Sequence, residues 1–301
     1  MRIAFLGNHT VGVRALEAIT REDEVVLVVT HPPDPEDGVR YESVYNFATA
    51  NGWNVIRSTG KDPALEGSLR DVHPDLIWIT DYRYLIPPSV IALPRRGAVN
   101  LHGSLLPKYR GRASVNWAIL KGETKLGLTA HFVDAGMDTG DIIAQEEFSL
   151  REDQDVGDAL NLLYPMFSRM TLRVLGYFRN NSVPRRPQNH SEASAFPRRR
   201  PEDGLIDWQQ PAREVLNLIR AVAAPYPGTF TNLGGSKLYV WKARIVEPKQ
   251  VYALPGSIIE NGADGLVVQC GEGILLLTNT QLIGDPQALR NGTVLGNRES
   301  P

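Results

Sequence analysis

The sequence predicts an α/β protein with a doubly wound, mostly parallel sheet, followed by a smaller C-terminal domain of β-strands. Two observations carry this prediction. In the N-terminal half, short continuous apolar runs alternate with stretches of helical length, and continuous apolar runs indicate strands that are covered on both faces. Near the C-terminus, short strand-like runs follow one another at close spacing, which is typical of a small β-barrel.

The N-terminal half contains the strands and helices expected of repeated βαβ units. Buried strands are predicted at residues 2–6, 25–30, 54–56, 76–80 and 98–100. The stretches 11–20, 43–51 and 65–72 are long enough to be the crossover helices between them. Parallel sheets of this kind bind ligands at the carboxyl ends of their strands, so functional residues are expected there.

A second strand pair and a long helix follow. Residues 128–133 and 141–146 are predicted strands, joined by a loop at 134–140 that is rich in turn formers. Apolar residues then recur in steps of four and three from Val156 to Tyr177, which predicts one amphipathic helix. Pro165 removes a backbone donor inside it, so we expect a kink or a break close to that residue.

A stretch rich in Pro, Arg and Ser indicates a domain boundary. We predict a catalytic domain at 1–183, a linker at 184–204 and a C-terminal domain at 205–301. The C-terminal domain should contain one helix at 211–223 and a small β-barrel, with strands at 229–233, 237–245, 256–259, 265–269 and 273–277.

Composition excludes several classes of protein. The chain has 301 residues, of which 42% are hydrophobic and 22% charged, as in ordinary globular proteins. No apolar run approaches the ~18 residues of a membrane-spanning helix, and no signal-peptide pattern precedes the first strand. We therefore expect a cytoplasmic protein with no membrane partner. The net charge of −2 gives no general attraction to nucleic acid, and the single cysteine, Cys270, excludes a cysteine zinc clip.

The turn after the first strand, residues 7–12, does not match a dinucleotide-binding fingerprint. It lacks the G-x-G-x-x-G pattern, and His31 stands where an acidic residue would bind a ribose. A tight turn at the edge of a pocket is the preferred interpretation. His9 lies in this turn, and its position at the end of the first strand suggests that it lines a pocket for an acceptor substrate.

Three polar residues form the candidate catalytic set. Asn100 and His102 lie two positions apart at the end of a buried strand, so they share one face. Alone, such a pair would usually be a core histidine and a capping asparagine that bond to backbone. Asp138, in the loop after the next strand, can reach the same edge of the sheet. A histidine that relays protons, a carboxylate that stabilises its charged form and an amide that donates to an oxyanion together suit acyl transfer to an amine.

Other uses of these residues fit the sequence less well. A serine hydrolase built on Ser104 would lack the G-x-S-x-G elbow. A metal site from His102, His131 and Asp138 would have no cysteine and no closely spaced ligand pair, so we expect no metal. A ligand-binding protein without activity is disfavoured by the intact polar set, and a hydrolase would not need a second substrate.

The polar set lies within a longer pattern. Residues 100–111, with Asn116-Trp117 and residues 137–142, resemble the signature of enzymes that use N10-formyltetrahydrofolate as formyl donor. The resemblance extends over the whole chain. It implies a Rossmann-like formyltransferase core with an OB-like C-terminal barrel, N10-formyltetrahydrofolate as co-substrate, and Asn100, His102 and Asp138 as the catalytic residues. It also implies direct attack of the acceptor amine on the formyl carbon, through a tetrahedral intermediate.

Within that family, the chain is similar to the formyltransferase part of the bifunctional enzyme that formylates UDP-4-amino-4-deoxy-L-arabinose, a sugar of lipopolysaccharide. The matching segments are residues 82–86, 108–112, 207–208 and 220–223. The resemblance implies a folate site in which the segment after the fourth strand, one arginine and the glycine-bearing loop take part. These residues are Tyr84, Leu85, Ile86, Arg112, Asp134, Ala135, Gly136, Met137 and Asp138.

Charge separates the two acceptors that the family offers. A methionyl-tRNA formyltransferase must hold a polyanion, but residues 201–301 contain eight Lys and Arg against ten Asp and Glu. Residues 32–40 are acidic, whereas the corresponding segment of the tRNA enzymes resembles a basic loop. The five arginines within 185–200 favour tRNA, although linker charges are usually only solvated. The sequence therefore predicts a nucleotide-linked 4-amino sugar as acceptor and no nucleic acid, with methionyl-tRNA or another small amine as alternatives. The identity of the sugar and the question of whether the chain forms a homodimer stay open.

Overall fold

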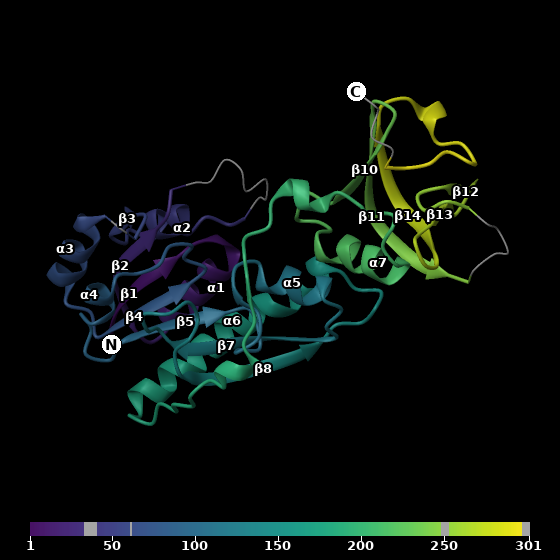
Figure 1. Cartoon of the computed structure of the whole chain (residues 1–301). Coiled ribbons are helices and arrows are strands. Elements are labelled where there is room, and N and C mark those ends of the chain that lie inside the picture. Colours follow the sequence, from purple (N-terminus) through teal and green to yellow (C-terminus); the bar gives the residue numbers. More distant parts are fainter. Residues whose placement is uncertain (33–40, 61, 248–252, 297–301) are drawn as a thin grey trace. The chain divides into compact units, whose positions relative to one another are not determined.

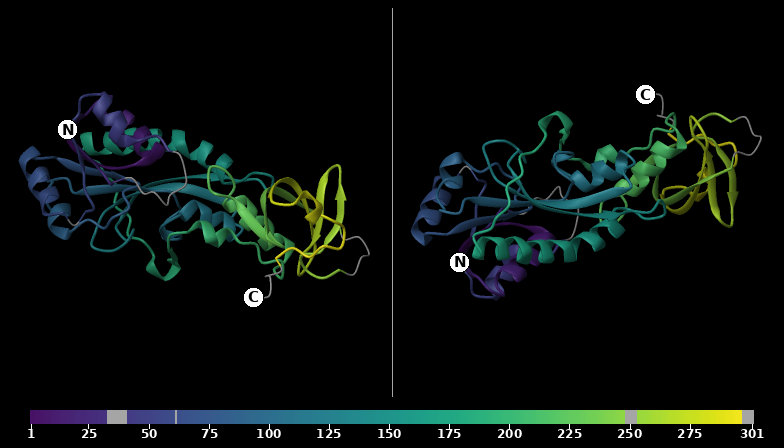
Figure 2. Two further views of the ribbon diagram at one scale, coloured as in Figure 1. Left: turned by 90° about the horizontal axis from the view of Figure 1, so that it is seen from above. Right: turned by 90° about the horizontal axis from the view of Figure 1, so that it is seen from below.

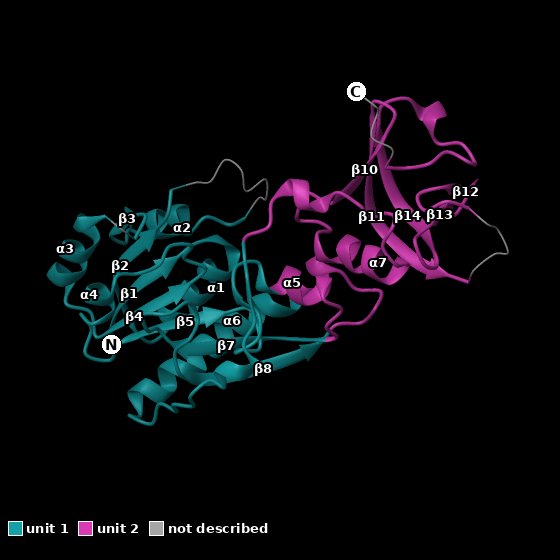
Figure 3. Cartoon of the chain, viewed as in Figure 1, with its two compact units in different colours: residues 1–114, 125–149, 160–197 teal, residues 115–124, 150–159, 198–301 magenta. Residues whose placement is uncertain are grey.

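The computed structural model describes residues 1–32, 41–60, 62–247 and 253–296 (Figure 1). The chain divides into two compact units, each assembled from separate segments (Figure 3). Unit 1 contains residues 1–114, 125–149 and 160–197, and unit 2 contains residues 115–124, 150–159 and 198–301. The acidic segment that the sequence analysis singled out lies almost wholly outside the described residues.

Unit 1 is built on a seven-stranded sheet in the order β3-β2-β1-β4-β5-β7-β8. The first five strands in this order are parallel, β7 is antiparallel to β5, and β8 is antiparallel to β7. The strands are β1 (Arg2–Gly7), β2 (Glu24–Thr30), β3 (Val55–Arg57), β4 (Leu76–Thr80), β5 (Ala98–His102), β7 (Lys125–Phe132) and β8 (Ile142–Ser149). This arrangement confirms the predicted doubly wound, mostly parallel sheet.

Helices cover both faces of this sheet, as the views in Figure 2 show. They are α1 (His9–Ile19), α2 (Val44–Ala50), α3 (Pro63–Val72), α4 (Pro88–Ile91) and α6 (Val156–Arg179). On one face, apolar side chains of β1, β2 and β4 pack with Leu65 and Leu69 of α3 and Val90 of α4. The other face carries α1, whose Gly12 approaches the ring of Phe5. Burial of strand side chains on both faces explains why the strands are continuously apolar.

Helix α6 differs from the prediction at Pro165. The helix runs unbroken from Val156 to Arg179, so the alternative of a break is wrong. Pro165 is exposed. The carbonyl of Asn161, which loses its partner because proline has no N–H, can therefore be hydrated at the surface, and the packed residues on either side hold the helix.

Unit 2 contains α5 (Ser114–Leu120), α7 (Ala212–Ala221) and a five-stranded antiparallel sheet in the order β10-β11-β14-β13-β12. Its strands are β10 (Thr229–Leu233), β11 (Ser236–Val246), β12 (Ile258–Gly262), β13 (Gly265–Gln269) and β14 (Ile274–Ile283). Val215, Leu216 and Ile219 of α7 pack into the same core as the inward side chains of this sheet. The five predicted strands are confirmed. Within the described residues, the end strands β10 and β12 are not paired with each other.

The predicted linker at 184–204 has local structure of its own. Arg186 exchanges backbone hydrogen bonds with Ile142 at the start of β8. Strand β9 (Ala195–Phe196) pairs in parallel with β6 (Arg110–Gly111), and η1 (His190–Glu192) and η2 (Pro201–Gly204) are short 3-10 helices. Residues up to 197 belong to unit 1, beyond the boundary predicted at 183. Short strands of two residues leave no periodic pattern in a sequence, which is why this segment resembled a linker. Across the described residues, no helix is long and apolar enough to cross a membrane.

Candidate active site

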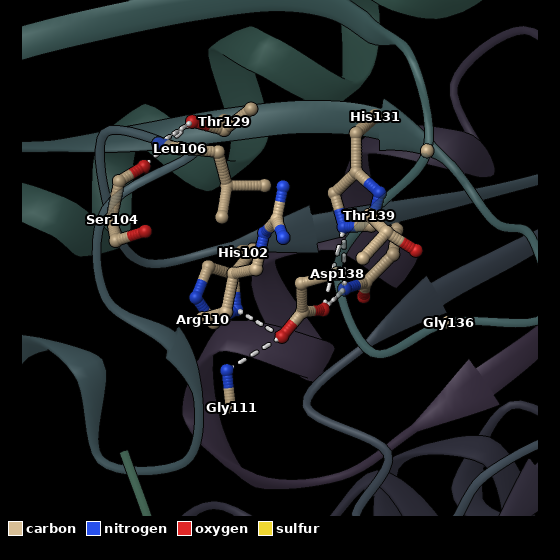
Figure 4. Close-up of polar contacts among 12 residues, drawn as sticks. His102, Ser104, Leu106, Arg110, Gly111, Thr129, His131, Gly136, Asp138 and Thr139 are labelled. Carbon is tan, nitrogen blue, oxygen red and sulfur yellow. Dashed lines mark hydrogen bonds and ion pairs between the residues drawn. The ribbon is translucent and has the colours of Figure 1, made fainter. Parts of the chain in front are cut away.

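The end of β5 and the loop between β7 and β8 bring the predicted polar residues together. Asn100 Nδ2 donates to Asp138 Oδ1 at 3.4 Å, and His102 Nδ1 lies 3.7 Å from Asp138 Oδ2. Figure 4 shows His102 and His131 converging on the Asp138 carboxylate. Because β7 runs antiparallel to β5, its last residue, Phe132, pairs with Val99 near the start of β5. The loop after β7 therefore begins at the amino end of β5, and it comes back along the strand to bring the Asp138 carboxylate to Asn100 and His102.

The two ring nitrogens of His102 have different surroundings. Nε2 lies 2.8 Å from the Tyr109 carbonyl oxygen. Since a carbonyl only accepts hydrogen bonds, Nε2 carries a hydrogen and donates it. Nδ1 faces the carboxylate of Asp138. The backbone of Tyr109 thus orients the imidazole, and Nδ1 is the nitrogen at which a proton can be gained or lost.

Asp138 is held in its ionised form. The backbone N–H of Gly111 donates to Asp138 Oδ2 at 2.8 Å. Burial raises the pKa of the carboxyl. This effect is outweighed by the charge of His102, by a hydrogen bond and charge from His131, and by the Gly111 N–H, so the pKa is well below its usual range. The backbone of Asp138 has a φ of 55°, in the left-handed region that non-glycine residues rarely adopt. Such backbone strain is frequent at functional sites.

His131, which the sequence suggested at most as a metal ligand, is also a member of the cluster. Its Nδ1 donates to the Phe132 carbonyl at 2.7 Å, and its Nε2 lies 3.1 Å from Asn100 Nδ2 and 3.5 Å from Asp138 Oδ1. In the register between β5 and β7, Asn100 is opposite His131. If the two predicted strands are aligned in this register, the sequence predicts the contact. No cluster in the described part of the chain has the arrangement of a metal site.

The glycines of the 134–140 loop are required by close contacts. Asp134 Oδ1 accepts hydrogen bonds from Gly136 N at 3.0 Å and from Thr139 Oγ1 at 2.5 Å, and a Cβ on Gly136 would lie 2.1 Å from that Thr139 oxygen. A Cβ on Gly140 would lie 1.9 Å from the Phe132 carbonyl oxygen. Only glycine allows the two ends of the loop to approach so closely.

A hydrogen bond connects two of the segments expected around the folate. Arg112 Nη2 donates to the Arg83 carbonyl at 2.5 Å, which ties the segment containing Tyr84, Leu85 and Ile86 to the strand that supports Asp138. Leu85 is 71% exposed, although its side chain is large and apolar. Met137 in the loop is likewise 46% exposed.

A cavity of about 300 Å³ adjoins the base of the loop. Its apolar lining includes Ile91, Ala98 and Val133. Its polar lining includes Asp134, Gln188, His190 and the backbone around Gly140, and of all the lining residues only Asp134 is also in the set expected for the folate. Apolar walls with a few polar groups are common in small-molecule sites, and this volume lies at the small end of their range.

His9 forms a second acid–histidine pair at the same edge of the sheet. Its Nδ1 lies 2.6 Å from Asp81 Oδ2, and its ring contacts that of Tyr41 with centroids 4.1 Å apart and an interplanar angle of 36°. Asp81 directly follows β4, the strand that pairs with β5. His31, in contrast, is buried, and burial lowers its pKa, which favours the neutral ring.

Ser104 has a structural role in this arrangement. It is 3% exposed, and its hydroxyl donates to the Lys108 carbonyl at 2.8 Å. The serine therefore supports the turn between β5 and β6, in keeping with the missing nucleophile motif.

Family models and curated relatives match nearly the whole chain. The Formyl transferase model matches residues 1–164, and the model of the formyl transferase C-terminal domain matches residues 199–289. The methionyl-tRNA formyltransferase of Acetivibrio thermocellus is 36% identical over 286 residues, covering 93% of this chain and 92% of that protein. The methionyl-tRNA formyltransferase of Alkaliphilus oremlandii is 32% identical over 311 residues, covering 98% of this chain and 100% of that protein.

A solved structure shares the fold. The N-formyltransferase from Helicobacter canadensis, in complex with folinic acid and dTDP-3-aminofucose, superimposes with a TM-score of 0.71 at 19% identity. The superposition covers 92% of this chain and 98% of that structure. At this identity, the similarity concerns the fold alone.

Proposed function

The chain belongs to the formyl transferase family, and from this premise we propose that it transfers the formyl group of N10-formyltetrahydrofolate to a primary amine at the Asn100–His102–Asp138 cluster. The observation that carries the proposal is the convergence of an amide, an imidazole and an ionised carboxylate at one edge of the sheet. A formyl carbonyl attacked by an amine develops negative charge on its oxygen, and this cluster supplies donors for that charge.

Asn100 is the first donor. Its Nδ2 lies 3.1 Å from His131 Nε2 and donates to Asp138 Oδ1 at 3.4 Å. The contact with Asp138 is long for a hydrogen bond, so this hydrogen can be redirected to an oxyanion at little cost.

His102 and Asp138 act as a pair. Asp138 stays ionised and favours the protonated imidazole through charge, at 3.7 Å from Nδ1. The Nδ1 hydrogen is then available as the second donor to the oxyanion. The amine must be neutral to attack. It loses a proton as the new C–N bond forms, and N10 of the folate gains a proton as the old C–N bond breaks. No covalent enzyme intermediate is needed.

The residues around the cluster fit a reduced folate. The cavity beside the loop offers apolar walls from Ile91, Ala98 and Val133 together with backbone polar groups, which suits a flat ring with donors and acceptors at its edge. Leu85 and Met137 expose apolar surface that the rest of the co-substrate can cover.

Relatives and charge favour different acceptors. The curated relatives above are methionyl-tRNA formyltransferases, which makes the amino group of methionyl-tRNA the first acceptor to test. This reverses the order expected from the sequence, in which tRNA was the alternative. It would also make nucleic acid a partner.

A nucleotide-linked amino sugar is the second candidate, because the C-terminal unit offers few cations for a polyanion. Residues 201–301 carry more acidic than basic residues. Of the basic ones, Arg213 pairs with Glu152, Arg220 donates to backbone carbonyls, and Lys237 lies over the Phe230 ring. Each phosphate of a bound tRNA that is neutralised needs its own cation, whereas a nucleotide sugar carries only a diphosphate.

One assay decides among these possibilities. The protein is incubated with N10-formyltetrahydrofolate and either initiator methionyl-tRNA or a panel of nucleotide-linked amino sugars, and mass spectrometry detects the formylated product. Turnover of the tRNA that declines steeply with salt supports the first acceptor. Turnover of the sugars alone replaces it with the second. His102→Gln should lose activity on either acceptor.

A reaction without any amine completes the test. Formate released at the same rate with and without an acceptor would make the protein a hydrolase and would contradict formyl transfer.

A further inference from the structure

We propose that Gln188 and Arg110 are positioning residues that clamp the loop carrying Asp138 in its reactive geometry. This inference rests on the proposed function, since it assigns the clamp to formyl transfer. Neither residue belongs to the catalytic set that the sequence predicts. Both are buried, with exposures of 6% for Gln188 and 8% for Arg110.

Gln188 holds the base of the loop by its amide nitrogen. Nε2 donates to the Asp138 carbonyl at 2.9 Å and to the Gly140 carbonyl at 2.8 Å. Two hydrogens thus bind two carbonyls on either side of Thr139. The backbone of Asp138 is fixed at the point where its φ is strained, and the rotation that would swing the carboxylate away from His102 breaks these bonds.

Arg110 determines which way the Gln188 amide faces. Its Nε and Nη2 donate to Gln188 Oε1 at 3.2 and 2.6 Å, and Nη2 also donates to His190 Nδ1 at 3.0 Å. A guanidinium only donates and a backbone carbonyl only accepts, so the oxygen of the amide must face Arg110 and the nitrogen must face the loop. A glutamine satisfies both sides, whereas a glutamate cannot donate to the two carbonyls when ionised.

These hydrogen bonds form a closed ring that includes the catalytic carboxylate. Arg110 binds Gln188, Gln188 binds the backbone of Asp138, and the Asp138 side chain accepts from the N–H of Gly111, the residue that follows Arg110. Backbone and side chain of Asp138 are therefore held from the same strand, β6. A displacement of the loop would break both the Gln188 bonds to the loop backbone and the Gly111 bond to the Asp138 carboxylate.

The surroundings of the loop explain why a clamp is needed. Residues 134–137 are exposed, whereas Gly140 is buried. The internal bonds from Asp134 join only residues 134, 136 and 139. Gln188 supplies the anchor between the loop and the segment after α6, next to the backbone bridge between Arg186 and Ile142.

Gln188→Glu tests the clamp with little change in shape. The new carboxylate keeps a partner for Arg110 but turns an oxygen toward each carbonyl that Gln188 holds. We expect kcat to decrease by up to about 10²-fold, the effect of misplacing a catalytic group by about 1 Å. Gln188 also lines the cavity, but its amide is occupied by Arg110 and the two loop carbonyls, so KM for N10-formyltetrahydrofolate should stay near the wild-type value. Backbone amides of 134–141 should exchange hydrogen faster.

Gln145→Glu is a matched control. Gln145 also accepts from an arginine, Arg186, and donates Nε2 to a backbone carbonyl, that of Leu106 at 2.8 Å, but it has no bond to the loop. It should leave kcat and loop exchange close to wild type. Arg110→Lys, which keeps the charge but loses the fork, should reproduce the effect of Gln188→Glu in weaker form.

The outcomes separate the clamp from its alternatives. An unchanged kcat in Gln188→Glu would overturn the proposal, as would a higher KM at unchanged kcat, which would make Gln188 a folate contact. Equal losses in Gln145→Glu would show a general effect on the sheet and would also overturn it. If the wild type transfers no formyl group, the proposed function fails. Hydrogen exchange then still decides the clamp, because unchanged exchange in Gln188→Glu contradicts it.

Discussion

His102 Nδ1 and Asp138 Oδ2 lie 3.7 Å apart, too far for a good hydrogen bond and close enough for strong attraction between charges. The two groups that face the His102 ring therefore have different roles. The Tyr109 carbonyl orients the ring, and Asp138 stabilises its charged form. Space between the two groups leaves the Nδ1 hydrogen available to a substrate oxygen.

Asn100→Ala should lower kcat by about 10²–10³, which is typical of losing one oxyanion donor, while N10-formyltetrahydrofolate binding stays nearly unchanged. The measurement is steady-state formyl transfer with folate affinity by calorimetry. Asn180→Ala, at an exposed position, serves as control. A loss of folate affinity that accounted for the whole defect would argue against an oxyanion role for Asn100.

Asp138→Asn should change how stability depends on pH. The pKa of Asp138 is lower in the folded protein than its ordinary value of 3.8, so the carboxylate stabilises the fold above that value and loses its contribution as the pH falls toward the folded pKa. The difference in free energy of unfolding between wild type and Asp138→Asn should therefore shrink between about pH 5 and about pH 2. Chemical denaturation at a series of pH values measures it.

Asp264→Asn, at an exposed position of unit 2, controls for removing one carboxylate. A difference that grew as the pH fell would mean that His102 and His131 do not stabilise the charge of Asp138.

Much of the fold could be predicted because burial on both faces leaves continuous apolar strands. The runs at 76–80 and 98–100 became β4 and β5, and neighbouring carboxyl ends placed Asn100 and His102 correctly. Strand β6 and strand β9 were missed, since two-residue strands have no period to detect. They arise from tertiary contacts, which a local pattern does not encode.

The supporting residues of the site could not be predicted from the sequence, for a similar reason. Gln188 is distant in sequence from Asp138, and its position in a stretch rich in proline and arginine indicated a linker. His131 was visible, but its contact with Asn100 depends on the register between β5 and β7. Residues that act through another side chain have no motif of their own. Their role appears only when the partners are brought together.

Gly140→Ala should destabilise the protein by about 1–3 kcal/mol and lower kcat, because the new Cβ would lie 1.9 Å from the Phe132 carbonyl oxygen and must displace the backbone next to Asp138. Gly176→Ala is the matched control. A Cβ at Gly176 meets no atom within 4 Å, and this glycine lies inside α6, so alanine there should stabilise by roughly 0.5–1 kcal/mol. Thermal unfolding and kcat measure both. An active, stable Gly140→Ala would show that the loop tolerates movement.

His9→Ala should raise KM for the acceptor amine and leave the affinity for N10-formyltetrahydrofolate unchanged. His9 and Asp81 follow β1 and β4, on the side of β5 away from β7 and the loop of Asp138, so two substrates can approach Asn100 and His102 from opposite sides. The cavity beside that loop supplies the folate side, which leaves the His9 side for the acceptor. Varying each substrate at saturation of the other separates the two KM values. His73→Asn, at an exposed helix end where asparagine tolerates the φ of 45°, is the control. A higher KM for the folate alone would place the two substrates the other way round.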